Sequence, residues 1–379
     1  MVNYGFLSTY PPTQCGLATF CAALLRHLSN PMAGSRCGVV QVVDGAYQTV
    51  RQDVAGSLVT VRPLSASRTA EVLNRYDVLI LQHEYGIYAG LDGEDLLDVL
   101  DRVQVPVVAV LHTVLACPTP HQRLVLQRVI DASDAVVVLS QTAAAALEAG
   151  YVIGEGRLSV IPHGAPPLPQ RRPSSASGLH PPTILTWGLI GPGKGIEWAI
   201  AALGYLRDLQ PAPRYLVAGQ THPKVLATQG EAYRDSLRRQ ARALGVADLV
   251  EFDPRYREVG SLMNVVRQAD VVLLPYDSSD QVTSGVLIEA VAAQRPVVAT
   301  GFPHARELLA GGAGLVVPHR DAQAMAHAVR RVLTEPGLSK AMTARCAALA
   351  PALSWSAVAN SYRALAASLL AAAPAAVAS

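Results

Sequence analysis

Short, continuous apolar runs alternate along this sequence with longer segments of helical periodicity. In the first half the runs are YGFLS, VVQVV, DVLILQH, VPVVAVLHT, DAVVVLS and LSVIPHG, and amphipathic segments such as 17–28 and 93–103 lie between them. A continuous apolar run, unlike an alternating one, is typical of a strand that is buried on both faces. The alternation therefore predicts repeated βαβ units built around a parallel sheet.

A stretch rich in proline and serine, APPLPQRRPSSASGLHPP, divides the chain into two such halves. After it the alternation resumes with TILTWG, RYLVAGQ, LVEFD, DVVLLPY, RPVVAT and GLVVP. The boundaries we expect are 1–165 for an N-terminal Rossmann-like domain, 166–182 for a linker, 183–352 for a C-terminal Rossmann-like domain and 353–379 for a last helix that packs back on the N-terminal domain. Ligands should bind at the C-terminal ends of the strands.

The composition excludes several classes of protein. The 379 residues suit two domains, and half of them are hydrophobic, which is enough for a sizeable core. A net charge of +2 gives no general attraction to nucleic acid or anionic lipid. The five cysteines have an odd count and no CxxC spacing, which favours a reduced, cytoplasmic setting. We expect no signal peptide, because the N-terminus lacks a basic region followed by an apolar run. We expect no membrane span, because no apolar run approaches about 20 residues.

Glycine-containing turns follow two of the predicted strands. After YGFLS a loop leads to Gly16 at the start of a helix, and after TILTW the loop GLIGPGKG contains Lys194. Glycine lets the backbone approach a ligand closely, and a helix N-terminus attracts phosphate. Lys194 would add a positive charge beside a diphosphate. An ordinary turn with a solvated lysine is the alternative, because neither stretch has the spacing GxGxxG or GxxxxGK[ST].

The stretch TSGVLIEA, residues 283–290, predicts a helix that begins just after the strand DVVLLPY. Ser284 is a good N-cap residue, and we expect the amide groups of Ser284, Gly285 and Val286 to face a phosphate. Glu289 lies within two turns of that end, so its carboxylate would accept hydrogen bonds from sugar or ribose hydroxyls. The alternative is a glutamate that merely stabilises the helix dipole.

Other catalytic chemistries find no support in the sequence. The chain has no cluster of histidine, cysteine or carboxylate residues with metal-ligand spacing and no DxD loop, so we expect no metal. It has no GxSxG motif, so we expect no serine nucleophile.

Six stretches together resemble the retaining nucleotide-sugar glycosyltransferases of family 4. They are PPTQCGLATF, LQHEYGIYAG, LHT, WGLIGPGKG, DQVTSGVLIEAVAAQRPVVAT and PHARELLAGGAGLVVPHRD, in this order, and they cover nearly the whole chain. The resemblance implies the GT-B fold, in which two Rossmann-like parallel-sheet domains face a central cleft, with a C-terminal helix. It also implies metal-independent transfer of a hexose, with retention, from a nucleoside-diphosphate sugar to a hydroxyl acceptor, and no cofactor beyond that donor.

The resemblance assigns the C-terminal half to the donor. Lys194 matches a lysine that binds the diphosphate, and Glu289 matches a glutamate that binds the donor's ribose. Gln281 stands where the family has a glutamate that faces the transferred sugar. The other donor-binding residues that we expect are Gly16, Gly188, Ser284, Gly285, Val286 and Arg255.

The N-terminal half is assigned to the acceptor side. His112 matches a family histidine near the donor sugar, so the catalytic residues expected are His112, Lys194 and Gln281. His83 and Glu84, at the end of another predicted strand, are expected on the acceptor side. His163 is expected to shape the hinge or touch the donor.

Two positions depart from the family pattern. Leu189 stands where an arginine usually binds the diphosphate, and Gln281 replaces a glutamate. Because catalysis in this family depends on stabilising the leaving diphosphate, another residue must compensate for the arginine. Arg255 and His222, at the ends of predicted strands, are the candidates.

Two other functions stay open beside a transferase. One is a nucleotide-sugar epimerase or hydrolase with the same fold, and the other is a non-catalytic nucleotide-sugar-binding subunit. The donor is expected to be a GDP- or UDP-sugar, with mannose mildly preferred, and the acceptor a glycan, a lipid or a small molecule. We expect no nucleic-acid partner, and peripheral contact with a membrane is left open.

Overall fold

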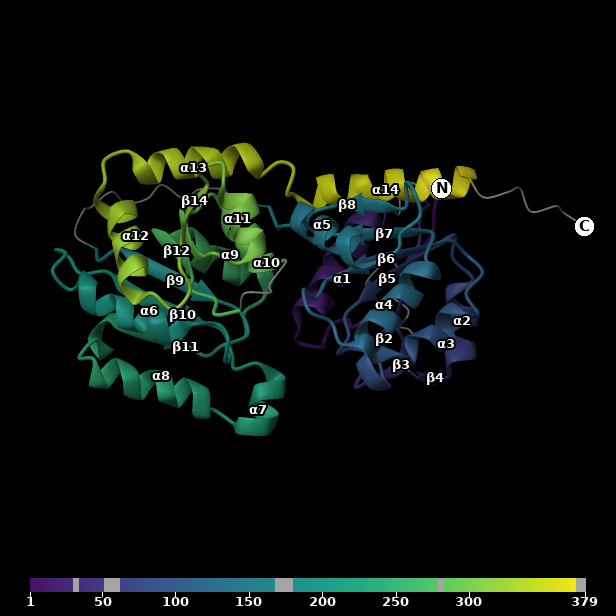
Figure 1. The fold of residues 1–379 in the computed structure, drawn as a ribbon, viewed down its shortest axis with the longest axis horizontal. Coiled ribbons are helices and arrows are strands. Elements are labelled where there is room, and N and C mark those ends of the chain that lie inside the picture. Colours follow the sequence, from purple (N-terminus) through teal and green to yellow (C-terminus); the bar gives the residue numbers. More distant parts are fainter. Residues whose placement is uncertain (30–33, 51–61, 168–179, 279–282, 373–379) are drawn as a thin grey trace, which may run out of the picture. The chain divides into compact units, whose positions relative to one another are not determined.

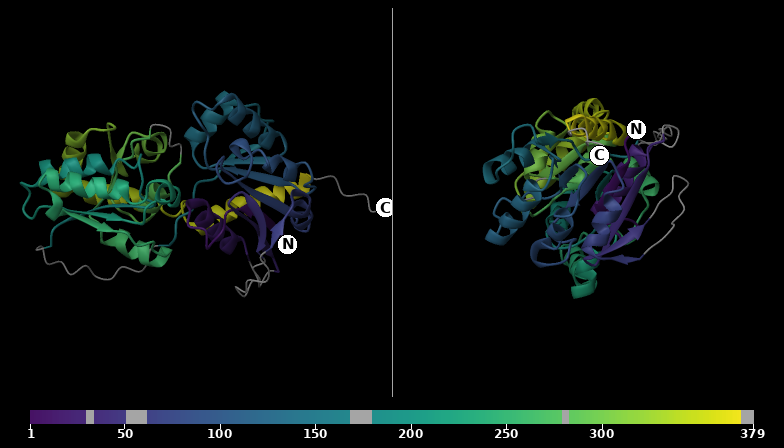
Figure 2. Two further views of the ribbon diagram at one scale, coloured as in Figure 1. Left: turned by 90° about the horizontal axis from the view of Figure 1, so that it is seen from below. Right: turned by 90° about the vertical axis from the view of Figure 1, so that its right-hand side faces the viewer.

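The computed structural model describes residues 1–29, 34–50, 62–167, 180–278 and 283–372. The chain folds as two compact units, of which unit 1 is Met1–Gly164 with Trp355–Ser379 and unit 2 is Ala165–Ser354. Each unit has its own sheet with helices on both faces (Figures 1 and 2).

The sheet of unit 1 is parallel except at one edge. Its strands run in the order β4 (Pro63–Leu64), β3 (Ala46–Val50), β2 (Cys37–Val43), β1 (Tyr4–Ser8), β5 (Val78–His83), β6 (Val107–Leu111), β7 (Ala135–Val138) and β8 (Leu158–Val160). From β2 to β8 all neighbours are parallel, as the sequence predicts. Strand β3 instead pairs antiparallel with β2 and with β4, which the sequence analysis did not anticipate.

The unexpected hairpin between β2 and β3 turns at Asp44-Gly45. Both residues have positive φ, 46° and 78°, which two-residue hairpin turns require and which glycine and aspartate tolerate. The side chains of β3 are only partly buried, so its sequence lacks the continuous apolar run that is typical of the other strands.

Side-chain caps mark where four of the helices of unit 1 begin. The helices of this unit are α1 (Gly16–Leu28), α2 (Ala66–Leu73), α3 (Leu96–Leu100), α4 (Pro120–Asp131), α5 (Gln141–Gly150) and α14 (Trp355–Ala372), with a 3-10 turn at Leu91–Gly93. The four capped helices are α1, α2, α4 and α5. Thr119 forms a capping box with Gln122, and Ser140 accepts a hydrogen bond from the amide of Ala143. Helix α14 packs on α1 and contributes Trp355 and Tyr362 to the core of unit 1.

The sheet of unit 2 is entirely parallel within the described residues. Its order is β11 (Val250–Asp253), β10 (Arg214–Ala218), β9 (Thr183–Trp187), β12 (Val271–Leu274), β13 (Val297–Thr300) and β14 (Gly314–Val317). The helices are α6 (Ile196–Leu203), α7 (Pro223–Gln229), α8 (Ala232–Ala243), α9 (Val259–Gln268), α10 (Gly285–Ala292), α11 (Pro303–Leu309), α12 (Ala322–Thr334) and α13 (Leu338–Leu349), with 3-10 turns at Gly204–Leu206 and Ala247–Leu249. The strand order reverses between β9 and β12, which is where ligands bind in sheets of this type.

All five cysteines carry free thiols. Among the helices of the described ranges, none has the length and apolar character needed to cross a bilayer.

Candidate functional site

A glycine-rich loop leaves β9 and packs against the end of β12, the two strands at the switch point of unit 2. Gly195 has φ of 65°, and a Cβ added there would lie 1.8 Å from the carbonyl oxygen of Pro275, so only glycine fits. The amide of Asp277 donates to the carbonyl of Gly193 at 2.9 Å, which fastens the loop from the other side. The backbone around Lys194 is therefore held at the C-terminal edge of the sheet.

Lys194 lies in this loop with its ammonium group over an aromatic ring. Its Nζ is 4.5 Å from the ring centroid of Tyr276, a cation–π contact, and Tyr276 is fully buried. Lys194 forms no ion pair within the part of the chain that the structure describes. A half-buried cation without a carboxylate partner suits the binding of an anion.

Glu289 projects from the second turn of α10 toward the end of β9. Its Oε2 accepts a hydrogen bond from the indole Nε1–H of Trp187 at 3.1 Å. Burial raises the pKa of Glu289 to about 7, and the bond from Trp187 acts in the opposite direction. The side chain keeps some exposure, so a ligand can reach it.

Ser284 caps α10, but its amide is not available to a phosphate. The hydroxyl accepts a hydrogen bond from the amide of Leu287 at 3.2 Å, as an N-cap should. The amide of Ser284 donates to Nδ1 of the buried His304 on α11 at 3.0 Å. Burial lowers the pKa of His304 to about 4, so this imidazole stays a neutral acceptor. The expectation that the amide of Ser284 faces a phosphate is therefore wrong, and the expectation for the amides of Gly285 and Val286 stays a prediction.

Gln281 lies outside the described residues. Val286 lies beside Gly188, because a Cβ added to Gly188 would be 3.8 Å from Cγ2 of Val286. Gly188 has φ of 127°, a conformation that side chains rarely adopt. The residues that the structure gathers around the ends of β9 and β12 are thus Gly188, Lys194, Gly285, Val286 and Glu289.

Arg255 lies at the end of β11, two strands away from β9. Its guanidinium donates to both oxygens of Asp253, at 2.7 and 3.1 Å, and a further arginine, Arg257, also binds that carboxylate. These arginines hold the pKa of Asp253 well below its usual range, so the pair is ionised. Arg255 is therefore committed to Asp253 in this structure.

His222, the other candidate for the missing charge, is tied to the glycine-rich loop. The amide of Ile190 donates to the carbonyl of Gln220 at 2.9 Å, and the amide of His222 donates to the carbonyl of Ile190 at 2.8 Å. Burial, Lys224 and Lys194 lower the pKa of His222, so it offers a hydrogen bond rather than a charge. Its Nδ1 accepts from the amide of Lys224 at 3.2 Å, which leaves the proton on Nε2.

Arg234 supports the loop after β10 and was missed by the sequence analysis. It is 1% exposed and donates to the carbonyl of Gly219 at 2.7 Å and to Glu231 at 3.2 Å. The helical period could have revealed it, because Arg234 shares the buried face of α8 with Leu237 and Ala241.

In unit 1, His83, Glu84 and His112 come together at the ends of β5 and β6. Nε2 of His112 donates to Oε1 of Gln82 at 2.6 Å, and Glu84 accepts from the hydroxyl of Thr113. Burial lowers the pKa of His83 to about 4 and the pKa of His112 to about 3. Both imidazoles are therefore neutral hydrogen-bonding groups near neutral pH.

Gly16 and His163 complete the predicted residues of unit 1. Gly16 is the first residue of α1, and a Cβ added there would meet nothing within 4 Å, so open space lies over the helix start. The ring of His163 packs 5.0 Å from Phe20 and 5.4 Å from Trp355. His163 thus contacts the aromatic cluster that joins α1 to α14.

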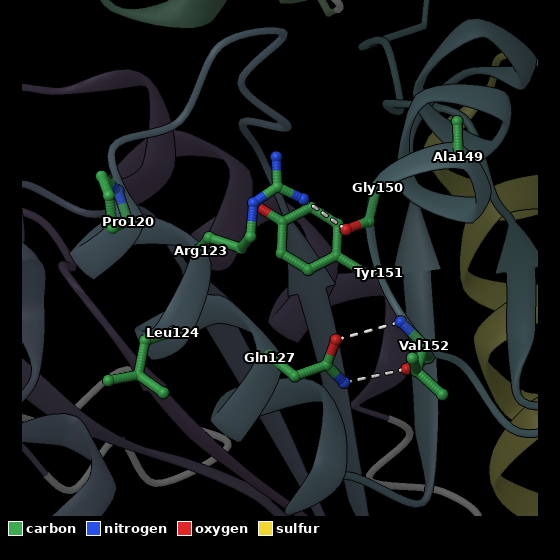
Figure 3. Close-up of a pocket in the computed structure, with 8 residues that line it drawn as sticks. All are labelled: Pro120, Arg123, Leu124, Gln127, Ala149, Gly150, Tyr151 and Val152. Atoms are coloured by element: carbon green, nitrogen blue, oxygen red, sulfur yellow. Dashed lines mark hydrogen bonds between the residues drawn. The ribbon is translucent and has the colours of Figure 1, made fainter.

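An open pocket of about 580 Å³ lies between α4 and α5, away from these residues (Figure 3). Arg123 donates to the carbonyl of Gly150 at 2.6 Å, and Gln127 forms two hydrogen bonds with the backbone of Val152, at 2.9 and 3.0 Å. The polar side chains that line this pocket therefore stabilise the backbone around it. Elsewhere in the described ranges, no group of three or more histidine, cysteine or carboxylate side chains is placed to hold a metal ion.

Both halves of the sequence match known families. Residues 34–167 match the family described as Glycosyltransferase Family 4, and residues 181–335 match the family described as Glycosyl transferases group 1. The D-inositol 3-phosphate glycosyltransferase of Segniliparus rotundus is 30% identical over 290 residues, which are 70% of this chain and 62% of that protein. The chain thus spans less than two thirds of the length of that relative.

Solved structures resemble the whole chain. Sucrose-phosphate synthase of Thermosynechococcus elongatus has a TM-score of 0.74 at 19% identity, covering 98% of this chain and 100% of that one. The HepE protein of Anabaena, in complex with UDP and glucose, has a TM-score of 0.73 at 16% identity, covering 97% and 100%. At these identities the likeness shows the fold.

Proposed function

The chain is a family 4-like glycosyltransferase with the GT-B fold, and from this premise we propose that it transfers a hexose from a nucleoside-diphosphate sugar to a hydroxyl acceptor. The observation that carries the proposal is that Lys194 and Glu289 both lie near the switch point of unit 2. A cation without an ion pair and a partly buried carboxylate are the groups that a diphosphate and a ribose need.

The donor is held by unit 2. Lys194 and the amides of Gly285 and Val286 bind the diphosphate, and the Nε2–H of His222 adds a hydrogen bond in place of the arginine missing at Leu189. Glu289 accepts hydrogen bonds from the ribose hydroxyls. Gln281, by its place in the sequence, binds the transferred sugar.

Unit 1 supplies neutral imidazoles and a carboxylate. His112 hydrogen-bonds the transferred sugar, Gly16 lets the backbone approach the donor, and His83 and Glu84 bind the acceptor. The acceptor oxygen forms a bond to the anomeric carbon as the bond from that carbon to the diphosphate breaks. The acceptor proton passes to the departing diphosphate on the same face, so configuration is retained without a metal.

Nucleotide choice is left between uridine and guanosine. The UDP and glucose in the HepE complex support a nucleoside-diphosphate donor, and mannose on GDP stays the mild preference from the family resemblance. A thermal-shift series with UDP-glucose, UDP-galactose, GDP-mannose and ADP-glucose separates them. A ligand at a hundred times its dissociation constant adds about 2.7 kcal/mol of stability.

Nucleotide release then distinguishes the three functions. A transferase releases nucleoside diphosphate only when an acceptor is present, whereas a hydrolase or epimerase turns over the donor alone. A binding subunit is stabilised by the donor and releases nothing. Failure of every nucleotide sugar and of free UDP and GDP to stabilise the protein would refute the donor site itself.

A further inference from the structure

The partner of Glu289 is a tryptophan far away in the sequence. Trp187 is the last residue of β9, and its side chain is buried, with 2% exposure. Its Nε1–H donates to Oε2 of Glu289 across 3.1 Å, joining the end of a central strand to α10. The residue after Trp187 is Gly188, where the glycine-rich loop with Lys194 begins.

An indole N–H is a donor only, so the direction of this bond is unambiguous. It occupies one carboxylate oxygen of Glu289 and restricts rotation of the carboxylate group. Hydrogen bonds to a carboxylate favour its ionised form. The rest of the Trp187 ring packs in the apolar core with Leu287 and Phe302, which a phenylalanine could also do.

We propose that Trp187 is a positioning residue of the donor site, whose indole holds Oε2 of Glu289 and thereby turns Oε1 toward the hydroxyls of the bound ribose. The inference rests on the proposed function, because it needs Glu289 to bind the nucleotide. It predicts that Trp187 acts on ligand binding through the ionisation and orientation of Glu289, not through contact with the ligand.

Two titratable side chains on helices near α10 have pKa values far from 7. Burial lowers the pKa of His304, on α11, to about 4, and burial raises the pKa of the Cys346 thiol, on α13, to about 11. The cations on the neighbouring segments include Arg295, which follows α10, Lys194, in the loop after β9, Arg306 on α11, and Lys340 and Arg345 on α13. A binding step near pH 7 that depends on Trp187 therefore reports Glu289, whose pKa lies at about 7.

The test is titration calorimetry of UDP and GDP between pH 6 and 9.5 with the wild type, Trp187→Phe and Glu289→Gln. Without the indole donor, Glu289 should ionise at higher pH, so Trp187→Phe should bind about tenfold more weakly than the wild type at pH 7 but within about threefold at pH 9.5. Titration of the nucleotide phosphate is common to all variants and cancels. Glu289→Gln should remove the dependence on Trp187, so the double variant should bind like Glu289→Gln alone.

Trp198→Phe is the matched control. Trp198 lies on α6 of the same unit, and its indole nitrogen is buried without a hydrogen-bond partner in the described structure. Its pH curve should superimpose on that of the wild type. A Trp187→Phe deficit that is undiminished in the Glu289→Gln background would show a packing role alone and overturn the inference.

A second measurement needs no Trp187 variant. With ¹⁵N-labelled indoles, assigned by elimination in Trp198→Phe and Trp355→Phe, the Nε1–H resonance of Trp187 should titrate near pH 7 in the wild type and not in Glu289→Gln. A resonance that does not titrate overturns the inference. Absence of any nucleotide binding by the wild type would instead refute the proposed function.

Discussion

At the scale of single residues, the proposed donor site combines a cation and an acid that each contact an aromatic side chain. Lys194 lies over the ring of Tyr276, and Glu289 accepts the indole N–H of Trp187. Both aromatic residues belong to the buried core of unit 2. The charged groups are therefore restrained before a ligand arrives, which reduces the reorganisation that binding requires.

Lys194→Ala should lower turnover by more than tenfold and leave the melting temperature nearly unchanged. Loss of one electrostatic stabiliser of a leaving group costs about 3 kcal/mol in the transition state. Lys340→Ala, which removes an exposed lysine of α13, is the control and should retain turnover. Steady-state kinetics of both variants measure the effect. Full activity in Lys194→Ala would show that Lys194 does not stabilise the leaving group.

Glu289→Gln should have a higher free energy of unfolding than the wild type at pH 8, in the absence of ligand. This gain should be larger at pH 8 than at pH 4.5. The pKa of Glu289 is about 7 in the folded protein against 4.5 for an ordinary glutamate, so the folded state holds the proton more tightly. The stability that the protonated group contributes is present below pH 4.5 and is lost as the pH rises through 7. Glutamine cannot ionise, so the variant should gain at most about 3 kcal/mol over the wild type across that range.

Urea unfolding at the two pH values measures this gain. Glu251→Gln, at a glutamate that is exposed and paired with Arg214, is the control and should show no such trend. A pH-independent difference between Glu289→Gln and the wild type would mean that Glu289 ionises normally. The same variant should bind UDP and GDP about tenfold more weakly at pH 8, because a hydrogen bond to a charged group is lost.

At the scale of elements, α8 fastens the loop after β10 through one buried arginine. Arg234 bonds the carbonyl of Gly219 and the carboxylate of Glu231, and Gly219 packs so closely on Gly188 that an added Cβ would lie 1.9 Å from its carbonyl oxygen. The helix is thus connected through two loops to the backbone that leads to Lys194.

Arg234→Met should destabilise the protein by about 2–3 kcal/mol, because it leaves a buried carbonyl without its partner. It should also raise KM for the donor, since the loops around Gly188 lose their support. Arg238→Ala on the same helix is the matched control. Arg238 forms an exposed pair with Asp235, so its loss should cost less than about 1 kcal/mol.

Chemical denaturation and donor kinetics test both effects. An Arg234→Met protein with wild-type stability would show that the buried guanidinium contributes nothing net. A destabilised variant with an unchanged KM for the donor would show that Arg234 contributes to stability and not to donor binding.

At the scale of the whole molecule, the chain returns to unit 1 at its C-terminal end. Helix α14 supplies Trp355, which is 5% exposed and packs 5.0 Å from Phe20 of α1. A Cβ added to Gly164 would lie 2.2 Å from the Trp355 ring, so the chain passes this ring with no space for a side chain. Residues from both ends of unit 1 thus share one core.

Trp355→Ala should therefore destabilise unit 1 by about 3–5 kcal/mol while unit 2 keeps its nucleotide site. Differential scanning calorimetry should show an earlier transition for unit 1 and a later one that UDP or GDP raises. Ser361→Ala, at an exposed position of α14, is the control. Loss of nucleotide binding in Trp355→Ala at temperatures below both thermal transitions would contradict the assignment of the donor site to unit 2.

Transfer activity should survive excess EDTA in the purified enzyme. The reason is the proposed role of Lys194, Gly285 and Val286, which neutralise the diphosphate without a cation. Activity that EDTA abolishes and Mg²⁺ or Mn²⁺ restores would overturn this mechanism.

The sequence by itself determined the parallel strands and the class of fold, but not the antiparallel edge of unit 1. The runs that became β1, β5, β6, β9 and β12 are continuous and apolar because strands buried on both faces need no polar side. Ser284 marks the start of α10 because capping is local. The motifs around Lys194 and Glu289 are also local, so they could be recognised in the sequence. The GT-B fold expected from them is confirmed.

Only the tertiary structure decided which side chains meet. Strand order brings Trp187 to Glu289, 102 residues away, and helix packing gives the amide of Ser284 to His304. Arg255 was a candidate for the missing charge, but the turn of the chain after β11 brings its guanidinium to Asp253. A hydrogen bond depends on distance and burial, and for residues far apart in the chain neither quantity exists until the sheet has formed.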